Sequence, residues 1–299
     1  MQSPSPSRTR MLVAVLPLAV LLAWGCSLVD SVQADKVLAG TVIATPETDL
    51  MFLLPDASLT VPFDSGIPIP LPDGGLPFST KVPAQTVAAI FFGQRAPDYT
   101  SQPKGIAGAS VTLSIDEKTF ALADQGSGAY GLTSQDDATF LYRDDADLKL
   151  TVVSGGTTYT ASVQAPPKDE IAQFSAVHPW PLEHTANTEL DLTRGNTDNV
   201  AFSTVIEVNQ NTALTDLKSI PSTFTDVPTT ALDLLDLVAN DSLWKRKVIP
   251  LPAKSFPTPN AYYGVLITAV KRGETSSNLF TASALLVGKS DLGVVKTRP

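Results

Sequence analysis

Hydrophobic and polar residues alternate with a period of two along much of this chain, which is the pattern of half-buried β-strands. The alternation is clear over residues 109–115, whereas Thr86–Phe92 is apolar on both faces, as expected of a fully buried strand. The strongest local signal is Leu148–Val163, where two alternating segments flank Gly155-Gly156 and predict a β-hairpin. Shorter strands are expected at residues 36–44, 129–132 and 138–142.

The same period returns in the second half of the chain. Thr188–Thr193 and Val200–Val208 read as strands. Near the C-terminus, Tyr263–Ala269 is expected to oppose Phe280–Leu286 across a turn that holds Gly273. One short helix is predicted over residues 231–239, because apolar residues there recur at a spacing of three behind a threonine that can cap the helix.

Residues 45–84 contain eight prolines, which fix φ and cannot donate a backbone hydrogen bond. This segment therefore cannot form a helix or a central strand. Within it, Ile67–Pro72 is expected to be extended, and Asp73-Gly74-Gly75 marks a turn. A stiff spacer or a loop packed over the fold is the favoured interpretation, and a proline-rich recognition motif is the alternative.

Strand segments separated by Gly, Pro and Asp turns predict an all-β protein with one or two antiparallel β-sandwich domains and a short helix in the C-terminal unit. The expected organisation is a signal peptide over 1–25, then a tether, first strand and proline-rich segment over 26–84. An immunoglobulin-like sandwich over 85–167 and a second β-sandwich unit over 168–299 follow.

Four phrases of the first unit resemble those of immunoglobulin-like or prealbumin-like modules of bacterial cell-envelope proteins. They are Ala109-Ser-Val-Thr-Leu, Gly128-Ala-Tyr-Gly-Leu, Leu148-Lys-Leu-Thr-Val and the closing tyrosine strand Gly156-Thr-Thr-Tyr-Thr-Ala. The resemblance covers about a quarter of the chain and rests on features of the fold, so it implies a sandwich and no particular ligand.

The N-terminus has the organisation of an export signal. Arg8 and Arg10 precede an apolar run over Met11–Leu22 that is shorter than the ~20 residues a membrane-spanning helix needs. The following Ala23-Trp24-Gly25-Cys26 resembles a bacterial lipobox, with alanine where the family usually has leucine. The resemblance implies cleavage before Cys26, lipid on its thiol, and attachment to the cell envelope, with the outer membrane as the expected location.

Cys26 is the single cysteine, so no disulfide can form within the chain, and a lipidated thiol leaves no cysteine for zinc or for nucleophilic catalysis. The formal net charge is −9, and removal of residues 1–25 leaves 19 basic and 30 acidic residues, a net charge of −11. Such a chain repels nucleic acid and anionic headgroups. We therefore expect no nucleic-acid partner and attachment to the membrane through covalent lipid.

Few residues suggest site chemistry. The two histidines, His178 and His184, flank two prolines that forbid a helix, so a zinc site with Glu183 lacks the usual helical spacing and a catalytic role is not expected. Calcium prefers several carboxylate oxygens from a turn, and this makes a short acidic run a weak candidate. Its members are Asp136, Asp137, Asp144, Asp145 and Asp147.

Two further patterns have simple interpretations. Gly288-Lys289-Ser290 imitates the end of a phosphate loop but lacks the earlier glycine, so it is read as a turn after a strand. Aromatic residues of the second unit are expected at the core edge, with a sugar-stacking face as the alternative. These residues are Trp180, Trp244, Tyr262 and Tyr263.

The sequence thus favours a lipid-anchored envelope protein whose sandwiches have a non-catalytic binding or structural role, with envelope proteins or glycans as partners and no cofactor. Two alternatives stay open: a secreted hydrolase with a site assembled from distant residues, and a carbohydrate-binding module.

Overall fold

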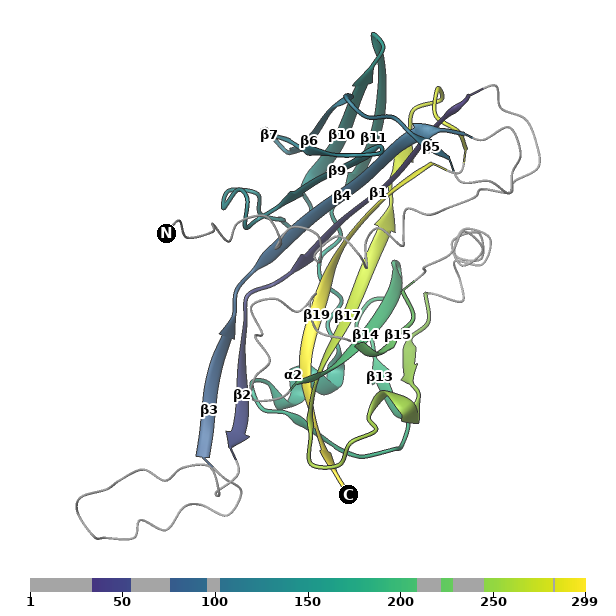
Figure 1. Cartoon of the computed structure of the whole chain (residues 1–299). Helices are drawn as coiled ribbons and strands as arrows, with labels where there is room; N and C mark the ends of the chain where they lie inside the picture. The colour runs from purple at the N-terminus through teal and green to yellow at the C-terminus, as the bar shows by residue number, and fades with distance from the viewer. Residues whose placement is uncertain (1–33, 55–75, 96–102, 209–221, 228–244, 282) are drawn as a thin grey trace, which may run out of the picture.

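The computed structural model describes residues 34–54, 76–95, 103–208, 222–227, 245–281 and 283–299, and it shows an all-β protein (Figure 1). Within these ranges the helices are short: α2 (Ala172–Val177) and the 3-10 turn η4 (Ala253–Ser255). No helix in the described ranges has the length and apolar character needed to cross a membrane. The predicted all-β class is therefore confirmed.

One large mixed sheet of ten strands runs through the molecule and contributes to both hydrophobic cores. Its main path runs β15 (Ser222–Thr225), β14 (Val200–Val208), β17 (Tyr262–Arg272), β19 (Ala284–Arg298), β1 (Lys36–Thr45), β4 (Gln85–Gln94), β9 (Ala129–Thr133) and β8 (Ala123–Gly126). Off this path, β5 (Lys104–Gly105) pairs with β4, and β12 (Leu182–Thr185) pairs with β19. β19 runs parallel to both β1 and β12, so the sheet is not purely antiparallel as expected from the sequence.

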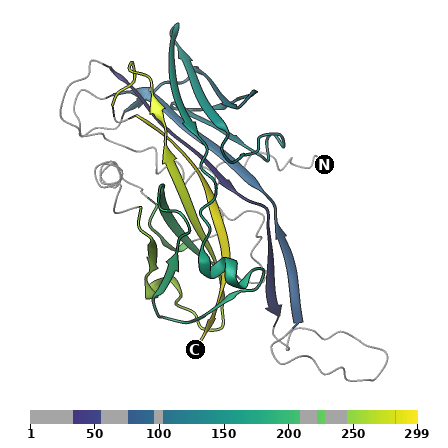
Figure 2. The ribbon, with the colours of Figure 1, turned by 180° about the vertical axis from the view of Figure 1, so that it is seen from behind.

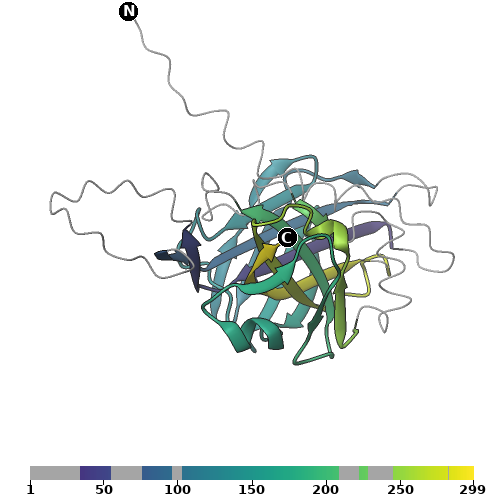
Figure 3. The ribbon, with the colours of Figure 1, turned by 90° about the horizontal axis from the view of Figure 1, so that it is seen from below.

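Three smaller sheets complete the fold. A five-stranded antiparallel sheet is made of β18 (Glu274–Thr275), β11 (Thr157–Gln164), β10 (Asp147–Ser154), β6 (Ser110–Ile115) and β7 (Lys118–Ala121). The two-stranded sheets are β13 (Leu190–Thr193) with β16 (Val248–Leu251), and β2 (Thr48–Leu54) with β3 (Leu76–Val82). β2 and β3 leave the body on the side away from β14 and β15 (Figure 2), and they also lie to one side when seen from below (Figure 3).

The large sheet is shared by two hydrophobic cores. In the upper sandwich, β1, β4 and β9 pack against β6, β10 and β11, and their contact side chains include Ile90, Leu113 and Leu150. In the lower sandwich, β14, β17 and the end of β19 pack against α2, β13 and β16. β19 supplies Val287 to the first core and Val295 to the second, so this long strand connects the two sandwiches.

The hairpin predicted over Leu148–Val163 is confirmed. β10 and β11 pair from Asp147 opposite Gln164 to Ser154 opposite Thr157. The glycines between them have φ angles of +56° and +77°, values that L side chains rarely adopt, and this is why the turn needs Gly155 and Gly156. The expected strands at 36–44, 86–92, 109–115, 129–132 and 200–208 are present as β1, β4, β6, β9 and β14.

Two strand predictions were wrong. Residues 138–142 form turns and irregular structure instead of a strand. The side chain of Phe140 is buried in the upper core, and this single contact anchors the segment without hydrogen-bond pairing to another strand. The partner of β17 also differs from the prediction, since Tyr263 lies opposite Val295 and Ala269 opposite Lys289. The apolar alternation of Phe280–Leu286 continues into a 15-residue strand, and the longer segment is the one that pairs with all of β17.

Other predictions are corrected or lie elsewhere. Gly288-Lys289-Ser290 is part of β19 and not a turn. The predicted helix at 231–239, the proline-rich residues 55–75 and Trp244 lie outside the described residues. The observed helix α2 was not predicted: Phe174 packs over Gly293 of β19, where a Cβ atom would lie 2.3 Å from the Phe174 ring. Glycine at this position allows the helix to approach the sheet.

Candidate binding groove

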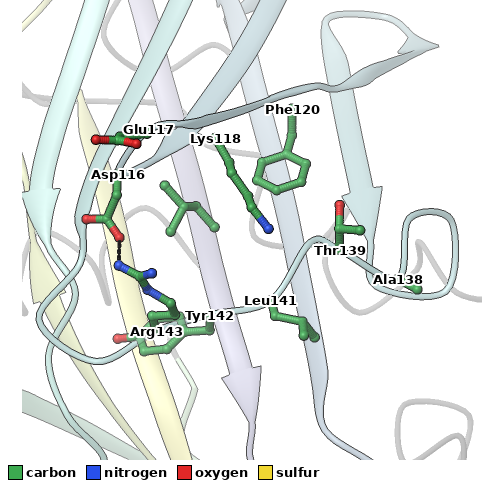
Figure 4. Close-up of a pocket in the computed structure, with 10 residues that line it drawn as sticks. Asp116, Glu117, Lys118, Phe120, Ala138, Thr139, Leu141, Tyr142 and Arg143 are labelled. Carbon is green, nitrogen blue, oxygen red and sulfur yellow. Dashed lines mark hydrogen bonds and ion pairs between the residues drawn. The ribbon is translucent and has the colours of Figure 1, made fainter.

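An apolar groove of about 780 Å³ opens at the side of the upper sandwich (Figure 4). One wall is the β6–β7 hairpin, which contributes residues 115–118 and Phe120. The other wall is residues 138–143 of the loop that joins β9 to β10. We call this feature the β7 groove. Its volume lies within the range of about 300–1,000 Å³ that is usual for ligand sites.

The β7 groove opens directly onto core side chains. Phe120 and Phe140 meet nearly edge to face, with ring centroids 5.1 Å apart, and Ile115 is buried beside them. The next residue, Leu141, points out of the core and is 47% exposed. An apolar surface exposed next to a core can bury further area only against a ligand or another protein.

Local hydrogen bonds order the loop wall. The amide N–H and Oγ1 of Thr133 donate to Asp136 at 3.1 and 2.7 Å, and the same groups of Thr139 donate to Asp137 at 2.8 Å each. The Thr139 backbone bond and then its hydroxyl bond lower the pKa of Asp137. Both carboxylates therefore stabilise turns and keep the wall in place.

Tyr142 fixes the loop to β4 and to the segment that follows β11. Its hydroxyl donates to the Pro166 carbonyl at 2.6 Å, and its amide N–H donates to Thr86 Oγ1 of β4 at 3.0 Å. Burial, reinforced by the charges of Asp144 and Asp145, raises the pKa of Tyr142 well above its usual value. The phenol therefore stays neutral and acts as a structural hydrogen-bond donor.

Charges surround the groove without giving it a net sign. Arg143 forms an ion pair with Asp116, which also accepts the Asp147 amide N–H at 3.0 Å (Figure 4). Glu117 and Lys118 have exposed side chains, and the charge of Lys118 also acts on Asp137. The groove therefore offers an apolar floor and one charge of each sign for a ligand at its rim.

The acidic run predicted as a weak calcium candidate does not converge. Asp136 and Asp137 each stabilise a separate turn, and Asp144 accepts Lys289 Nζ at 2.8 Å. Asp145 has a φ of 62°, and Asp147 is exposed at the start of β10. Over the described part of the chain, no three His, Cys, Asp or Glu side chains lie close enough to hold a metal ion.

The histidines do not form a site with Glu183. His184 in β12 lies with Nε2 3.1 Å from the Thr188 carbonyl and contacts the Phe256 ring edge. Glu183 accepts Arg298 Nε at 2.6 Å, whereas His178 follows α2. From the sequence, the two histidines would be expected to share one interdomain loop, but His184 lies in β12, opposite Thr297 of β19.

The aromatic candidates are dispersed. Trp180 is 46% exposed, Tyr263 is buried in the lower core, and Tyr262 is half-buried on the other face of β17. They do not make a row of exposed rings in the described structure. Cys26, the predicted lipid attachment residue, lies outside the described residues.

Two buried carboxylates, which sequence reasoning did not single out, hold the segment between the sandwiches. Asp169 pairs with the fully buried Arg194 and accepts the Asn196 amide N–H at 2.7 Å. Asp291 of β19 accepts the Ile171 amide N–H at 2.9 Å and Lys168 Nζ at 3.2 Å. For Asp291, the sequence signal that could have revealed it is an acidic residue inside the largely apolar segment that forms β19. Both carboxylates have structural roles.

A second cavity of about 500 Å³ lies beside this segment. It is more polar than the β7 groove, and Asp145, Asp198 and Lys271 line it together with Arg272. Arg272 already donates to the carbonyls of Thr281 and Ser283 at 3.3 Å, so its guanidinium holds the fold together. This cavity presents mixed charges without a convergent catalytic or binding geometry.

Comparison with known proteins gives no family for this chain. No family model matches the sequence, and no curated protein matches it either.

Proposed function

We propose that this protein is a lipid-anchored component of the bacterial cell envelope that has a non-catalytic binding role, with the β7 groove as its binding site. The observation that carries the proposal is the apolar groove over the upper core, in which ordered loop hydrogen bonds keep Leu141 exposed. The export signal that ends at Cys26 supports the location, and the mature chain's net charge disfavours binding to nucleic acid.

A short connection supports the anchoring part of the proposal. Residues 27–35 separate Cys26 from β1, which starts at Lys36 and lies in the middle of the large sheet. Nine extended residues span at most about 30 Å. Lipid on Cys26 would therefore hold the sandwiches close to the membrane surface, where the groove can meet other envelope components.

Fractionation tests the anchor. The Cys26→Ser variant should leave the membrane fraction or keep its uncut leader, whereas a Ser27→Ala control should stay processed and membrane-bound. An unchanged membrane fraction and mature mass for Cys26→Ser would refute lipid attachment at this residue.

Photo-crosslinking in whole cells tests the binding role. A photoreactive phenylalanine analogue at position 141 should form adducts, because that side chain is exposed in the groove. The matched control carries the analogue at Val153, which is 40% exposed on the outer face of the five-stranded sheet. Equal adduct yields at both positions, or none at position 141, would exclude the β7 groove as a binding site.

A further inference from the structure

The strand β7 is an open edge of the five-stranded sheet. Its residues Lys118–Ala121 all pair with β6, and among the described residues no strand lies on its other side. The same strand forms one wall of the β7 groove, and residues 138–143 form the other. Backbone hydrogen-bonding groups and an apolar surface therefore lie next to each other at this edge.

The register shows which backbone groups of β7 face outward. The Leu122 amide N–H donates to the Val111 carbonyl at 2.9 Å, so these opposed residues form a hydrogen-bonded pair. Hydrogen-bonded and non-hydrogen-bonded pairs alternate along an antiparallel ladder, so Phe120 also bonds to its partner in β6. Thr119 and Ala121 alternate with these positions. Their N–H and C=O groups therefore point away from β6, toward the open edge.

Other sheet edges in the described structure are less suited to accept a strand. At one edge of the large sheet, β8 has a register shift between Asp124 and Gly126, and such irregular edges resist further pairing. At the opposite edge, β15 pairs with β14 through another register shift, and β18 of the smaller sheet has two residues. In contrast, β7 pairs in regular register over its whole length and adjoins the groove.

One face of β7 determines which side chains a docked strand must present. Phe120 meets Phe140 at the core, and Lys118, two residues earlier, lines the groove from the same face (Figure 4). Every strand pair of this sheet is antiparallel. A further antiparallel strand would place one inward side chain beside Phe120 and the side chain two positions later beside Lys118.

The chemistry of these neighbours defines the occupant. An apolar side chain beside Phe120 would cover the exposed surface of Leu141, and an acidic side chain beside Lys118 would form a cross-strand pair of opposite charge. The other base at the rim, Arg143, is already paired with Asp116, whereas Lys118 is exposed on the groove side. The groove and its edge thus complement an extended backbone that carries an apolar and an acidic residue.

We propose that the β7 groove binds an extended peptide segment of a partner protein, which joins the five-stranded sheet as a new antiparallel strand beside β7. Two hydrogen-bonded pairs, at Thr119 and Ala121, supply about four main-chain bonds. An apolar residue followed two positions later by Asp or Glu gives the segment its specificity. This inference rests on the binding role proposed for the β7 groove, and it names the chemical class of the partner.

Proline substitution tests strand addition, because it removes one outward N–H. Thr119→Pro should keep β7 paired with β6, since proline is tolerated at strand edges, but should reduce protein adducts of the photoreactive analogue at position 141 at least about fivefold. Thr119→Val is the matched control: it loses the same hydroxyl contact with Ser114 and keeps the N–H, so its adduct yield should not change. Ala121→Pro repeats the test at the second outward position, and far-UV circular dichroism checks the fold of each variant.

Charge reversal tests the acidic position without changing the backbone. Lys118→Glu should reduce the same adducts at least about twofold, because an attractive cross-strand pair becomes repulsive. The matched control is Lys149→Glu, since Lys149 is exposed on the outer face of the same sheet. Mass spectrometry of the digested adducts should find an apolar residue followed two positions later by an acid in the linked segment.

The outcomes separate this inference from the binding role itself. Protein adducts that persist undiminished in both proline variants would overturn strand addition and leave the binding role in place. Adducts that resist protease and have the mass of a glycan or a lipid would do the same. Equal yields from Lys118→Glu and Lys149→Glu would overturn the acidic specificity. An absence of adducts at position 141 in the otherwise unchanged chain would refute the binding role and this inference together.

Discussion

Removal of the Asp169 carboxylate should severely destabilise the lower sandwich. The Arg194 side chain is fully buried and that of Asp169 is 2% exposed, so Asp169→Ala would strand a guanidinium charge away from water. Arg194 would keep its bonds to the carbonyls of Asn199 and Arg246, at 2.7 and 3.1 Å, but these do not neutralise it. Asn196 would also lose the acceptor of its amide N–H.

The expected cost follows from measurements on other buried pairs. Removing one partner of a buried ion pair typically costs about 3–5 kcal/mol. That is a large part of the roughly 5–15 kcal/mol that keeps a typical domain folded. With about 2–4 °C per kcal/mol for chains of this size class, the Tm should fall by roughly 6–20 °C.

Urea unfolding of the purified protein monitored by tryptophan fluorescence, together with thermal circular dichroism, measures this effect. Asp191→Ala is the matched control, because Asp191 is exposed on β13, and its change should stay within about 0.5 kcal/mol. The double variant Asp169→Leu/Arg194→Met should be no less stable than Asp169→Ala, since it removes the stranded charge. A loss below about 1 kcal/mol for Asp169→Ala would refute this account of the pair.

Three further results are expected. Phe140→Ala should cost about 3–5 kcal/mol in urea unfolding because Phe140 is fully buried, whereas Leu141→Ser next to it should change stability by less than about 0.5 kcal/mol; equal costs would contradict the groove geometry. Gly156→Ala should lower the free energy of unfolding by about 1–2 kcal/mol, because its φ of +77° strains an L residue. No atom lies within 4 Å of an added Cβ, so the cost comes from the backbone conformation and not from a clash. An unchanged urea midpoint would show that the turn adapts. The amide N–H groups of Gly108 and Gly126 lower the pKa of Asp124, so NMR titration should place it below the ordinary value of about 3.9. Its stabilising contribution is then present above that value and is lost as the pH falls through the lower folded pKa, which an Asp124→Asn variant should not show.

Local patterns predicted most of the strands because strand formation depends on neighbours in sequence. The β10–β11 hairpin is specified by side chains that alternate on one face and by two glycines that accept positive φ. Likewise, the apolar run of β4 predicted a strand, and β4 lies between β1 and β9 in the large sheet. Burial on both faces holds at Ile90–Phe92, whereas Val87 and Ala89 are half-buried. These features require no knowledge of distant partners.

Strand partners, in contrast, were decided only by the tertiary structure. The alternation in Phe280–Leu286 is compatible with several registers, and the fold selects one in which β19 continues to Arg298 and joins both cores. The parallel pairing of β1 with β19 joins segments more than 240 residues apart, which no local pattern specifies. Register depends on which faces are buried, and burial is a property of the assembled sheets.

The same reason explains the candidate site. The sequence gives Leu141 an apolar side chain, but the exposure of that side chain results from the position of residues 138–143 beside β7. The contacts of Phe140 with Phe120 and of Tyr142 with Thr86 and Pro166 fix this position. Asp169 and Arg194, 25 residues apart, become a pair only when both are buried together. The sequence by itself determined most of the strand segments and the turn chemistry of the β10–β11 hairpin. Only the packing of the sheets decided which charges are buried and which apolar side chains stay exposed, because both depend on distant neighbours.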